Sequence, residues 1–363
     1  MKQIDRLVIK ELLGPWIFGV AMFSALLMAA TYLNKIAEYV VRGLSPVIIG
    51  KITLLLMPAI LAKTFAMSML LSSLLAFGRL SSDSEVTALR AAGASVPRIV
   101  RPVFLFSLLV AAVTFFVNDQ VAPPAERTSL AMVMSIDNLQ SKAGAPVFFP
   151  IDGALVVAQR FDTLNSKLFG VTLVVADKNG DPTLYMHCKE LEYHRDTQEW
   201  HIRGGASLVP ADGGVRSDVA EAWPKDVPKP KVSPQDIATI NNKDMDVYSM
   251  ADAVAQIESG RRNGTLDQKT IRNLEFGYWN KISVALAAIV FGTLGAVLGI
   301  RNQRTNASTG FALAVAIIFG YFMVVNFMNV WALNGILPPW VASFAPVVVG
   351  MVCSCFMMWR RNQ

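Results

Sequence analysis

Three histidines at a spacing of seven residues, His187, His194 and His201, are the side chains in this 363-residue chain best suited to hold a metal ion. Imidazole is a common zinc ligand, but the sequence places no Cys or carboxylate ligands around them at the usual spacing. An odd spacing along one β-strand also puts neighbouring histidines on opposite faces. We therefore expect no metal and no cofactor, and interpret the histidines as surface or groove residues.

Catalytic motifs are missing from the sequence as well. It contains no nucleophile elbow, no HExxH helix and no nucleotide-binding glycine loop. Cys188 is the one cysteine in the polar middle of the chain, while Cys353 and Cys355 lie in the last apolar run, so no disulfide framework is expected. An enzyme acting on lipids would lack a catalytic set, and we predict a protein that binds rather than reacts.

A charged segment between two apolar runs is the second candidate site. Residues 78–102, GRLSSDSEVTALRAAGASVPRIVRP, predict a short helix near 81–93. A serine at position 81 or 82 can cap it, with Asp83 and Glu85 in a first turn that favours negative charge. Such a helix is either a solvated connector or a docking element with Glu85 as the anchoring charge.

Long apolar runs must position these residues. A bilayer core of about 30 Å needs about 20 apolar residues in a helix, because backbone polar groups in lipid must be paired internally. Runs of this kind occupy residues 12–33, 52–78 and 282–300, with a shorter one at 103–118, and two more lie within 305–359, which is interrupted by NGILPP at 334–339. The sequence therefore predicts six spans, with Lys63 as the one charge inside the second.

Basic residues fix the orientation of these spans. They gather at alternate ends of the runs, at Lys2, Arg6, Lys10, Arg79, Arg90, Arg98, Arg101, Arg301, Arg304, Arg360 and Arg361. The short loops on the opposite side carry Lys35, Arg42 and Lys51. By the positive-inside rule, both termini are cytoplasmic and the polar middle of the chain is outside. The first run is longer than a signal-peptide core and reads as an uncleaved anchor.

The charge balance agrees with this layout. Residues 121–280 contain 17 Lys+Arg against 21 Asp+Glu, whereas the chain as a whole has a net charge of +6. The basic excess thus belongs to the membrane segments, and it gives no argument for nucleic-acid binding.

The polar middle reads as β structure that returns to the membrane through a helical segment at 248–276. Short runs rich in Val, Phe, Leu and Tyr alternate with turn-forming clusters, which predicts strands at Val147–Ile151, Ala154–Phe161, Leu168–Ala176, Thr183–His194 and Glu199–Arg203. This spacing suggests a sandwich or jelly roll. Apolar residues such as Val171, Leu173 and Val175 either fill its core or line a groove that accepts acyl chains.

The predicted fold is an α-helical membrane protein with six transmembrane helices and an inserted β-jellyroll domain. Residues 1–120 would form the first three helices, 121–280 the periplasmic domain and 281–363 the last three helices.

Two segments carry a family resemblance. The run SEVTALRAAG at 84–93 resembles the cytoplasmic coupling helix of the LptF/LptG lipopolysaccharide export permeases, and GILPPW at 335–340 is similar to the segment before their last span. The likeness extends over the whole chain. One departure lies at the start of the fourth span. The family often has Glu, then Arg a few residues later, then Pro, whereas here Glu275 is followed by Lys281 and no proline.

The resemblance implies an inner-membrane permease subunit of an ABC transporter, without an ATPase of its own. It implies four partners: a second paralogous permease, a cytoplasmic ATPase dimer, a single-span periplasmic bridge protein and lipopolysaccharide. Asp83, Glu85 and Arg90 would contact the ATPase, and the β-jellyroll would pass lipid to the bridge. Lys35 and Arg42 would hold lipid A phosphates.

Alternatives remain at several of these points. Lys35 and Arg42 could instead snorkel to lipid headgroups. Asn326 and Asn329 could line a protein interface or a cavity, and Gly295 and Gly299 form a GxxxG pattern for close helix packing. A membrane-anchored receptor, or a mechanotransmitting subunit that moves no lipid, is the competing function. A lipid path requires a cavity open to the outer leaflet, whereas a receptor needs only a packed bundle.

Overall fold

The structure is a computed structural model that describes residues 2–41, 44–140, 147–151, 154–162, 165–177, 181–194, 197, 199–214, 217–219, 222–224, 227–230, 234, 237, 247–263, 268–300 and 307–362.

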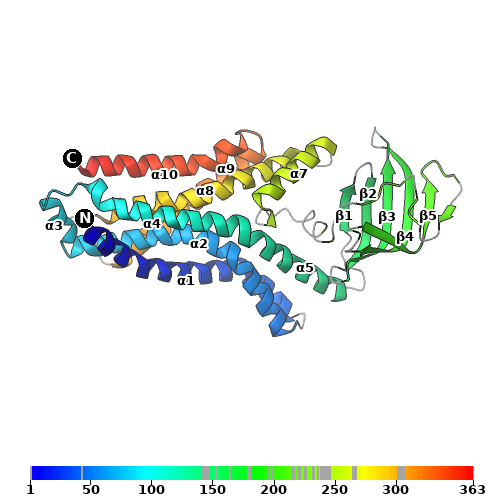
Figure 1. The fold of residues 1–363 in the computed structure, drawn as a ribbon, viewed down its shortest axis with the longest axis horizontal. Helices are drawn as coiled ribbons and strands as arrows, with labels where there is room; N and C mark the ends of the chain where they lie inside the picture. Colours follow the sequence, from blue (N-terminus) through cyan, green and yellow to red (C-terminus); the bar gives the residue numbers. More distant parts are fainter. Residues whose placement is uncertain are drawn as a thin grey trace. The chain divides into compact units, whose positions relative to one another are not determined.

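The helices extend beyond the apolar runs that predict them. They (Figure 1) are α1 Lys2–Val41, α2 Pro46–Ser82, α3 Glu85–Ala91, α4 Val96–Phe116, the π-helix η1 Val117–Val121, α5 Ala122–Gln140, α7 Met250–Asn263, α8 Gln268–Gly299, α9 Ala307–Leu333 and α10 Pro339–Asn362.

The chain divides into two compact units. The first, the helical unit, comprises Met1–Pro123, Tyr248–Gly260 and Leu266–Gln363. The second, the sheet unit, comprises Pro124–Val247 and Arg261–Thr265. The helical segment expected at 248–276 corresponds to α7 and the first turns of α8.

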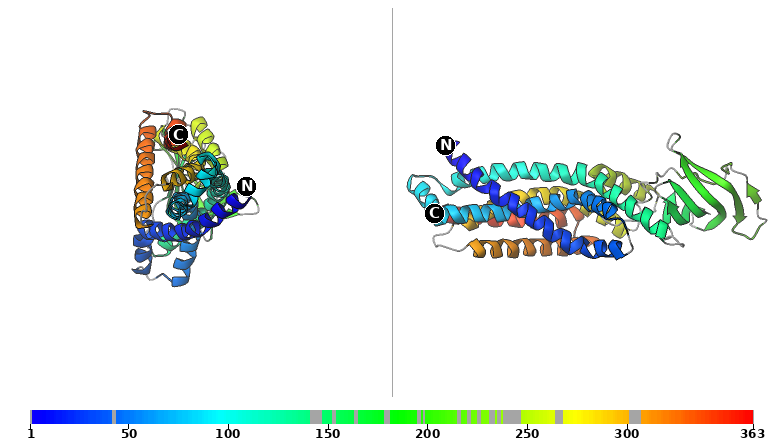
Figure 2. Two further views of the ribbon diagram at one scale, coloured as in Figure 1. Left: turned by 90° about the vertical axis from the view of Figure 1, so that its left-hand side faces the viewer. Right: turned by 90° about the horizontal axis from the view of Figure 1, so that it is seen from below.

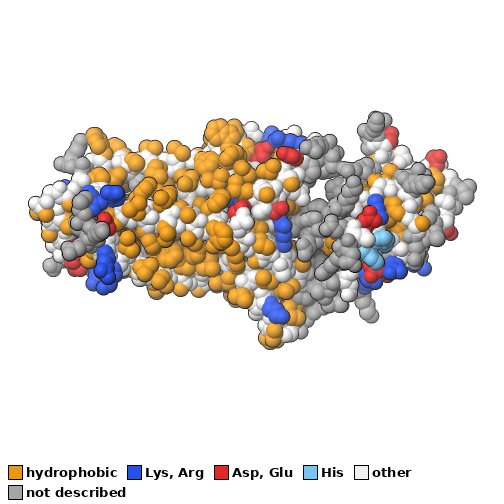
Figure 3. All heavy atoms as spheres, in the orientation of Figure 1, with side chains coloured by type: hydrophobic (Ala, Val, Ile, Leu, Met, Phe, Trp, Pro, Cys, Tyr) orange, Lys and Arg blue, Asp and Glu red, His pale blue; other side chains and the backbone are white. Residues whose placement is uncertain are grey.

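Among the residues that the structure describes, six helices are long and apolar enough to cross a membrane, as expected from the apolar runs. They are α1, α2, α4 continued into α5, α8, α9 and α10. Figure 2 shows both chain ends at the end of this unit where α3 lies, as an even number of crossings requires. Hydrophobic side chains cover the face of the helices visible in Figure 3, and Lys and Arg side chains lie at both ends of this hydrophobic band. This surface matches a bilayer core with a basic rim.

Close packing of α2 against α8 forms the centre of the helical unit. A Cβ added at Gly295 would overlap Ser73 Oγ and lie 2.7 Å from the carbonyl oxygen of Leu70. At Gly299 it would lie 2.7 Å from Phe77 Cβ. The GxxxG pattern therefore does bring two helix backbones together, the usual use of small residues in membrane helices.

Replacing Gly295 by valine is expected to destabilise the helical unit strongly. The added methyls meet the backbone of α2, and overpacking of a filled core costs about 1–3 kcal/mol or more. Thermal unfolding of the purified chain in detergent measures the effect. Gly320→Val is the matched control, because a Cβ at Gly320 meets no atom within 4 Å. Equal unfolding temperatures for the two variants would contradict this account of α2–α8 packing.

The sheet unit contains one antiparallel sheet in the described residues, with its strands paired in chain order. The strands (Figure 1) are β1 Val147–Ile151, β2 Ala154–Asp162, β3 Lys167–Ala176, β4 Pro182–His194, β5 Glu199–Pro210 and β6 Ser217–Val219. The five predicted strands are all present. Sequential pairing is a meander, so the two-sheet jelly roll expected from the sequence is not seen among the described strands.

Two details of the sheet differ from the sequence prediction. β5 extends through Gly204 and Gly205, which have φ of 76° and 79°, to Pro210. Both glycines lie opposite a register shift between Cys188 and Glu190 in β4. Glycine tolerates this left-handed conformation, so the pair makes a bulge and the strand continues beyond Arg203, where the predicted strand ends. β6 was not predicted.

Candidate functional site

A cavity of about 770 Å³ lies within the helical unit, lined by α1, α2, α8 and α9. Its walls are mainly apolar, with Phe23, Leu26, Phe276 and Phe319 among them. Leu26 on α1 is 62% exposed and Phe319 on α9 is 71% exposed. Because these lining residues also reach the outer surface of the helices, the cavity opens sideways between α1 and α9. An apolar chain in the surrounding bilayer could enter without crossing a polar barrier.

A few polar side chains interrupt this apolar lining. Lys63 on α2 is half-buried and is the one charged residue in the described lining. Tyr32, Asn280, Asn326 and Asn329 also line the cavity. Lys63 therefore faces the interior of the bundle, and the asparagines of α9 line a cavity. A cation in an apolar pocket is costly unless an anion or another polar group meets it, so such residues commonly mark substrate paths.

Lys35 lies next to this cavity without lining it. It is exposed on α1, and its ammonium lies 5.7 Å from the centroid of the Tyr32 ring, itself part of the lining. This position is compatible with either role considered for Lys35, snorkelling or contact with a phosphate. Arg42, the other predicted contact, lies outside the described residues.

A buried charged cluster that the sequence did not reveal joins α8 to η1 and α7. Lys281 is 5% exposed, and its Nζ donates to the carbonyl oxygen of Asn118, 2.6 Å away. Asp119 Oδ1 lies 3.9 Å from the same Nζ and accepts from the backbone N–H of Met250 at 2.7 Å. The carboxylate thus meets both the lysine and the first residue of α7. Helix α7 has its own capping box, in which Ser249 and Asp252 bond each other's backbone N–H.

The proposed ATPase-contacting residues lie at the end of the helical unit that carries α3. Glu85 is the first residue of α3, Arg90 lies near its end, and Asp83 precedes it; all three side chains are exposed. Val86 is buried in the core of the helical unit, so its side chain attaches the short helix to the other helices of this unit. The charged face of this loop is therefore presented to solvent on a fixed support.

The capping prediction for this helix was wrong. The serines at 81 and 82 are the last residues of α2, and Asp83 is its C-cap, with its N–H bonded to the carbonyl of Arg79. Ser84 then takes a left-handed conformation with φ of 63° and makes no side-chain capping bond. The end of the helix is as expected, since Gly93 has φ of 85° just beyond the C-cap.

Two ion pairs connect the start of α1 to the helices around α3. Arg98 Nη2 lies 3.4 Å from Asp5 Oδ2, and Arg79 Nη1 lies 3.1 Å from Glu11 Oε2. Val8, between the two acidic residues, is buried with Val86 in one apolar cluster. The ion pairs join α1 to α2 and α4, the apolar cluster joins α1 to α3, and α1 lines the cavity further along its length.

In the sheet unit, the residues predicted for an acyl groove belong to a packed core. Val171 is 1% exposed and Leu173 is fully buried, while Val175 packs against the same cluster from its edge. Val227 and Ile237, from the chain after β6, belong to this cluster too. In this conformation Val171 and Leu173 have the surroundings of core residues.

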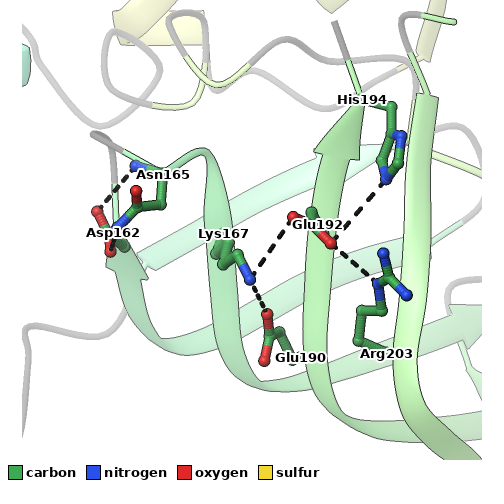
Figure 4. Close-up of polar contacts among 7 residues, drawn as sticks. All are labelled: Asp162, Asn165, Lys167, Glu190, Glu192, His194 and Arg203. Carbon is green, nitrogen blue, oxygen red and sulfur yellow. Dashed lines mark hydrogen bonds and ion pairs between the residues drawn. The ribbon is translucent and has the colours of Figure 1, made fainter.

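Charged residues form a network on the opposite face of this sheet (Figure 4). Lys167 lies between two carboxylates, and its hydrogen bond to Glu190 at 2.7 Å raises the lysine's pKa. Arg203 donates to Glu192 at 2.9 Å and lowers the pKa of that carboxyl. His194 lies 3.9 Å from the same carboxylate. These side chains are partly exposed, and such pairs contribute little to stability.

The histidines and the buried cysteine of the sheet unit show no reactive chemistry. The rings of His194 and His201 lie with their centroids 4.7 Å apart and their planes tilted by 59°, and His187 Nδ1 lies 2.9 Å from Thr172 Oγ1. Within the described residues no group of three or more His, Cys, Asp and Glu side chains could hold a metal ion. Burial raises the pKa of Cys188 to about 12, which keeps the thiol protonated and a poor nucleophile.

Six membrane-length helices in the described part of the chain, an inserted antiparallel sheet and a laterally open apolar cavity together indicate a polytopic membrane protein of the permease class. The family model described as lipopolysaccharide export system permease LptF/LptG matches residues 6–360, and the chain belongs to this family. It is similar to the lipopolysaccharide export system permease protein LptG of Haemophilus influenzae, with 23% identity over 345 residues that cover 90% of this chain and 89% of that protein.

Family membership makes the chain a transport component of lipopolysaccharide export in the inner membrane, rather than an enzyme. The sequence predicted only some of the polar residues that line the cavity. Lys63, Asn326 and Asn329 stand out as polar residues in apolar runs. Tyr32, Asn280 and the Asp119–Lys281 cluster were missed. For Lys281 the signal was present, since it immediately precedes an uncharged run.

Proposed function

We propose that this chain extracts lipopolysaccharide from the outer leaflet of the inner membrane, as the permease subunit of an ABC transporter, and passes it toward a periplasmic bridge. The cavity between α1 and α9 is the observation that supports this best. Its apolar walls fit acyl chains, and Lys63 inside it and Lys35 beside it offer cations to the phosphates of the same lipid. Its lateral opening gives a route from the bilayer.

The remaining partners are proposed from the resemblance to the family. A second, paralogous permease would complete the cavity along the exposed faces of α1 and α9. A cytoplasmic ATPase dimer would bind the loop with Asp83, Glu85 and Arg90 and drive α1 through the ion pairs at its start. Both termini would be cytoplasmic, because they lie at the end of the helical unit that carries α3. A single-span bridge protein would then receive the lipid.

The sheet unit would carry lipid in this scheme through its apolar face, arranged with further chain segments as a jelly roll. Val171, Leu173 and Val175 would contact acyl chains on that face. Because Val171 and Leu173 are buried here, transfer requires the core cluster to open.

The competing function, a receptor or mechanotransmitting subunit that moves no lipid, requires only a packed bundle. That scheme does not require a cavity with an internal lysine, so the cavity supports the transport function. ATP-dependent release of lipopolysaccharide from proteoliposomes that contain this chain, its paralogue and the ATPase to a soluble periplasmic acceptor distinguishes the two. Normal assembly and ATP hydrolysis without release would favour the competing function.

Replacing Lys63 by glutamine is expected to lower lipopolysaccharide crosslinking from a photoreactive residue at position 319 by about tenfold or more, because a hydrogen bond to a charged group contributes about 1.5–3 kcal/mol. Lys63→Arg should retain most of the signal. Lys51→Gln is the matched control, since Lys51 is an exposed lysine of the same helix outside the cavity lining. Equal crosslinking in the Lys63→Gln and Lys51→Gln variants would remove Lys63 from the lipid path.

A further inference from the structure

A polar hollow of about 470 Å³ lies on the outward face of the sheet, the face opposite the apolar core of the sheet unit. Four polar residues of its lining lie opposite one another on the adjacent strands β3 to β6, namely Thr172, His187, Ser207 and Asp218. They alternate along their strands with core residues such as Leu173, which directs their side chains outward. Hydroxyl, imidazole and carboxylate groups therefore share a surface that acyl-chain binding does not use.

Three glycines beside this row leave space above the backbone. Gly170, Gly204 and Gly205 line the hollow with φ of 59°, 76° and 79°. The strand register places all three at the level of Lys189 in β4. A glycine inside a strand commonly marks a bulge or a place where a ligand approaches the backbone. The glycines therefore give the hollow a floor of bare backbone.

The alternation of buried and outward residues changes phase at this same level in four adjacent strands. Neighbouring core residues are three or four positions apart here instead of two: Ala158 and Phe161 in β2, Leu168 and Val171 in β3, Cys188 and Leu191 in β4, and Ile202 and Ala206 in β5. Each strand therefore turns additional residues away from the core. Because the phase changes are aligned across the sheet, the hollow belongs to the fold of four strands and not to one loop.

The groups that reach the hollow both donate and accept hydrogen bonds. The Gln159 carboxamide lies over the glycine floor, since a Cβ at Gly170 would come within 2.6 Å of Gln159 Oε1. Lys189 is an exposed cation of the lining and Asp218 an exposed anion, so neither sign of charge dominates. A phosphate-rich ligand would need a set of cations, which this lining lacks among its described residues.

The hollow also offers no apolar anchor point to a protein partner. Val171, Cys188 and Ala206 line it, but their side chains are buried in the core cluster, so their backbone faces the hollow. The other described lining residues are polar or glycine. Dominant contacts in protein interfaces are usually large side chains, often aromatic, in fitted and desolvated pockets. This lining favours a small polar ligand.

We propose that this hollow binds a sugar ring. Sugar hydroxyl groups donate and accept hydrogen bonds at short intervals, as the groups of the lining do. A ring can also lie close to the backbone where glycines leave no side chain in its way. The sugar part of lipopolysaccharide is the source that the proposed function supplies, and with that source the inference rests on the proposed function. A lipid-free glycan of the cell envelope would offer the same chemistry.

The test measures the binding of two lipid-free probes to the full chain in nanodiscs, the oligosaccharide released from lipopolysaccharide and a peptide-free cell-wall glycan. Saturation-transfer NMR titrations give a dissociation constant for each probe. We expect the lipopolysaccharide oligosaccharide to bind, and His187→Ala to raise its dissociation constant about three- to tenfold through loss of one hydrogen bond. His194→Ala, which alters an exposed histidine of the same strand outside the lining, should leave the constant unchanged.

A second pair of variants tests the cation of the hollow. Lys189→Ala should weaken oligosaccharide binding by about tenfold or more, because hydrogen bonds from charged groups are stronger than neutral ones. Lys229→Ala is the matched control, since Lys229 lies outside the lining and pairs with the exposed Glu199. Such surface pairs contribute little to stability, so neither lysine variant should unfold the sheet unit.

The possible results separate the sugar site from the proposed function. Binding of neither probe, or equal losses in the His187→Ala and His194→Ala variants, would overturn the sugar site. Binding of the cell-wall glycan alone would support the sugar site and exclude lipopolysaccharide as its source. Loss of a copurifying protein in His187→Ala, with no sugar binding by the intact chain, would show a protein contact instead. Failure of ATP-driven lipopolysaccharide release, with oligosaccharide binding intact, would refute the transport function alone.

Discussion

Reversal of Glu85 to lysine is expected to release the cytoplasmic ATPase from the permease while the chain still inserts in the membrane. Glu85 begins α3, its side chain is exposed, and it makes no ion pair with any described residue. A charge-assisted hydrogen bond to a partner is worth about 1.5–3 kcal/mol, so its loss weakens assembly by about 10- to 100-fold. Repulsion from the reversed charge adds to this.

Copurification of the ATPase and lipopolysaccharide release per ATP hydrolysed measure the effect. Glu85→Asp should retain most of both, because it keeps the charge at the helix start. Thr87→Lys introduces the same charge at an exposed position of the same helix and controls for a general effect on α3. Full complex yield with normal transport in Glu85→Lys would show that α3 docks without this carboxylate.

Replacing Lys281 by methionine is expected to reduce the yield of folded protein more than the other changes within the membrane segments. The substitution removes the donor to the Asn118 carbonyl and the cation beside Asp119, both in buried surroundings. Removing one partner of a buried charged pair costs about 3–5 kcal/mol. The loss also loosens η1, since π-helical turns persist where surrounding contacts hold them.

Unfolding of the purified protein in detergent measures this loss, and a double-mutant cycle assigns it. Asp119→Asn keeps an acceptor for the Met250 N–H while it removes the charge. The pair Lys281→Met and Asp119→Asn should therefore be more stable than Lys281→Met alone. Lys281→Arg should remain closest to the starting protein. Strictly additive losses in the cycle would mean that Lys281 and Asp119 act independently.

Local patterns predicted most of the architecture because each depends on a short stretch of chain. An uncharged run of 20 residues spans a membrane whatever its neighbours do, since the transfer free energy adds along the run. The strands were equally readable, because turn-forming clusters bound them. The errors at the start of α3 and in the length of β5 occurred where the backbone adopts a left-handed conformation that the residue pattern does not reveal. Ser84 adopts a left-handed conformation without being glycine, and Gly204 and Gly205 form a bulge inside a strand.

The sequence by itself determined the six spans, the β domain between them, the exposed charges of α3 and the family. Tertiary structure alone decided which polar residues act together. Lys281 and Asn118 are 163 residues apart in the chain, yet a hydrogen bond joins them. Four helices from both ends of the sequence form the cavity, and only their packing brings Lys63 and Asn329 into the same lining. Long-range packing sets these neighbours, and no local pattern of residues encodes which helix faces meet.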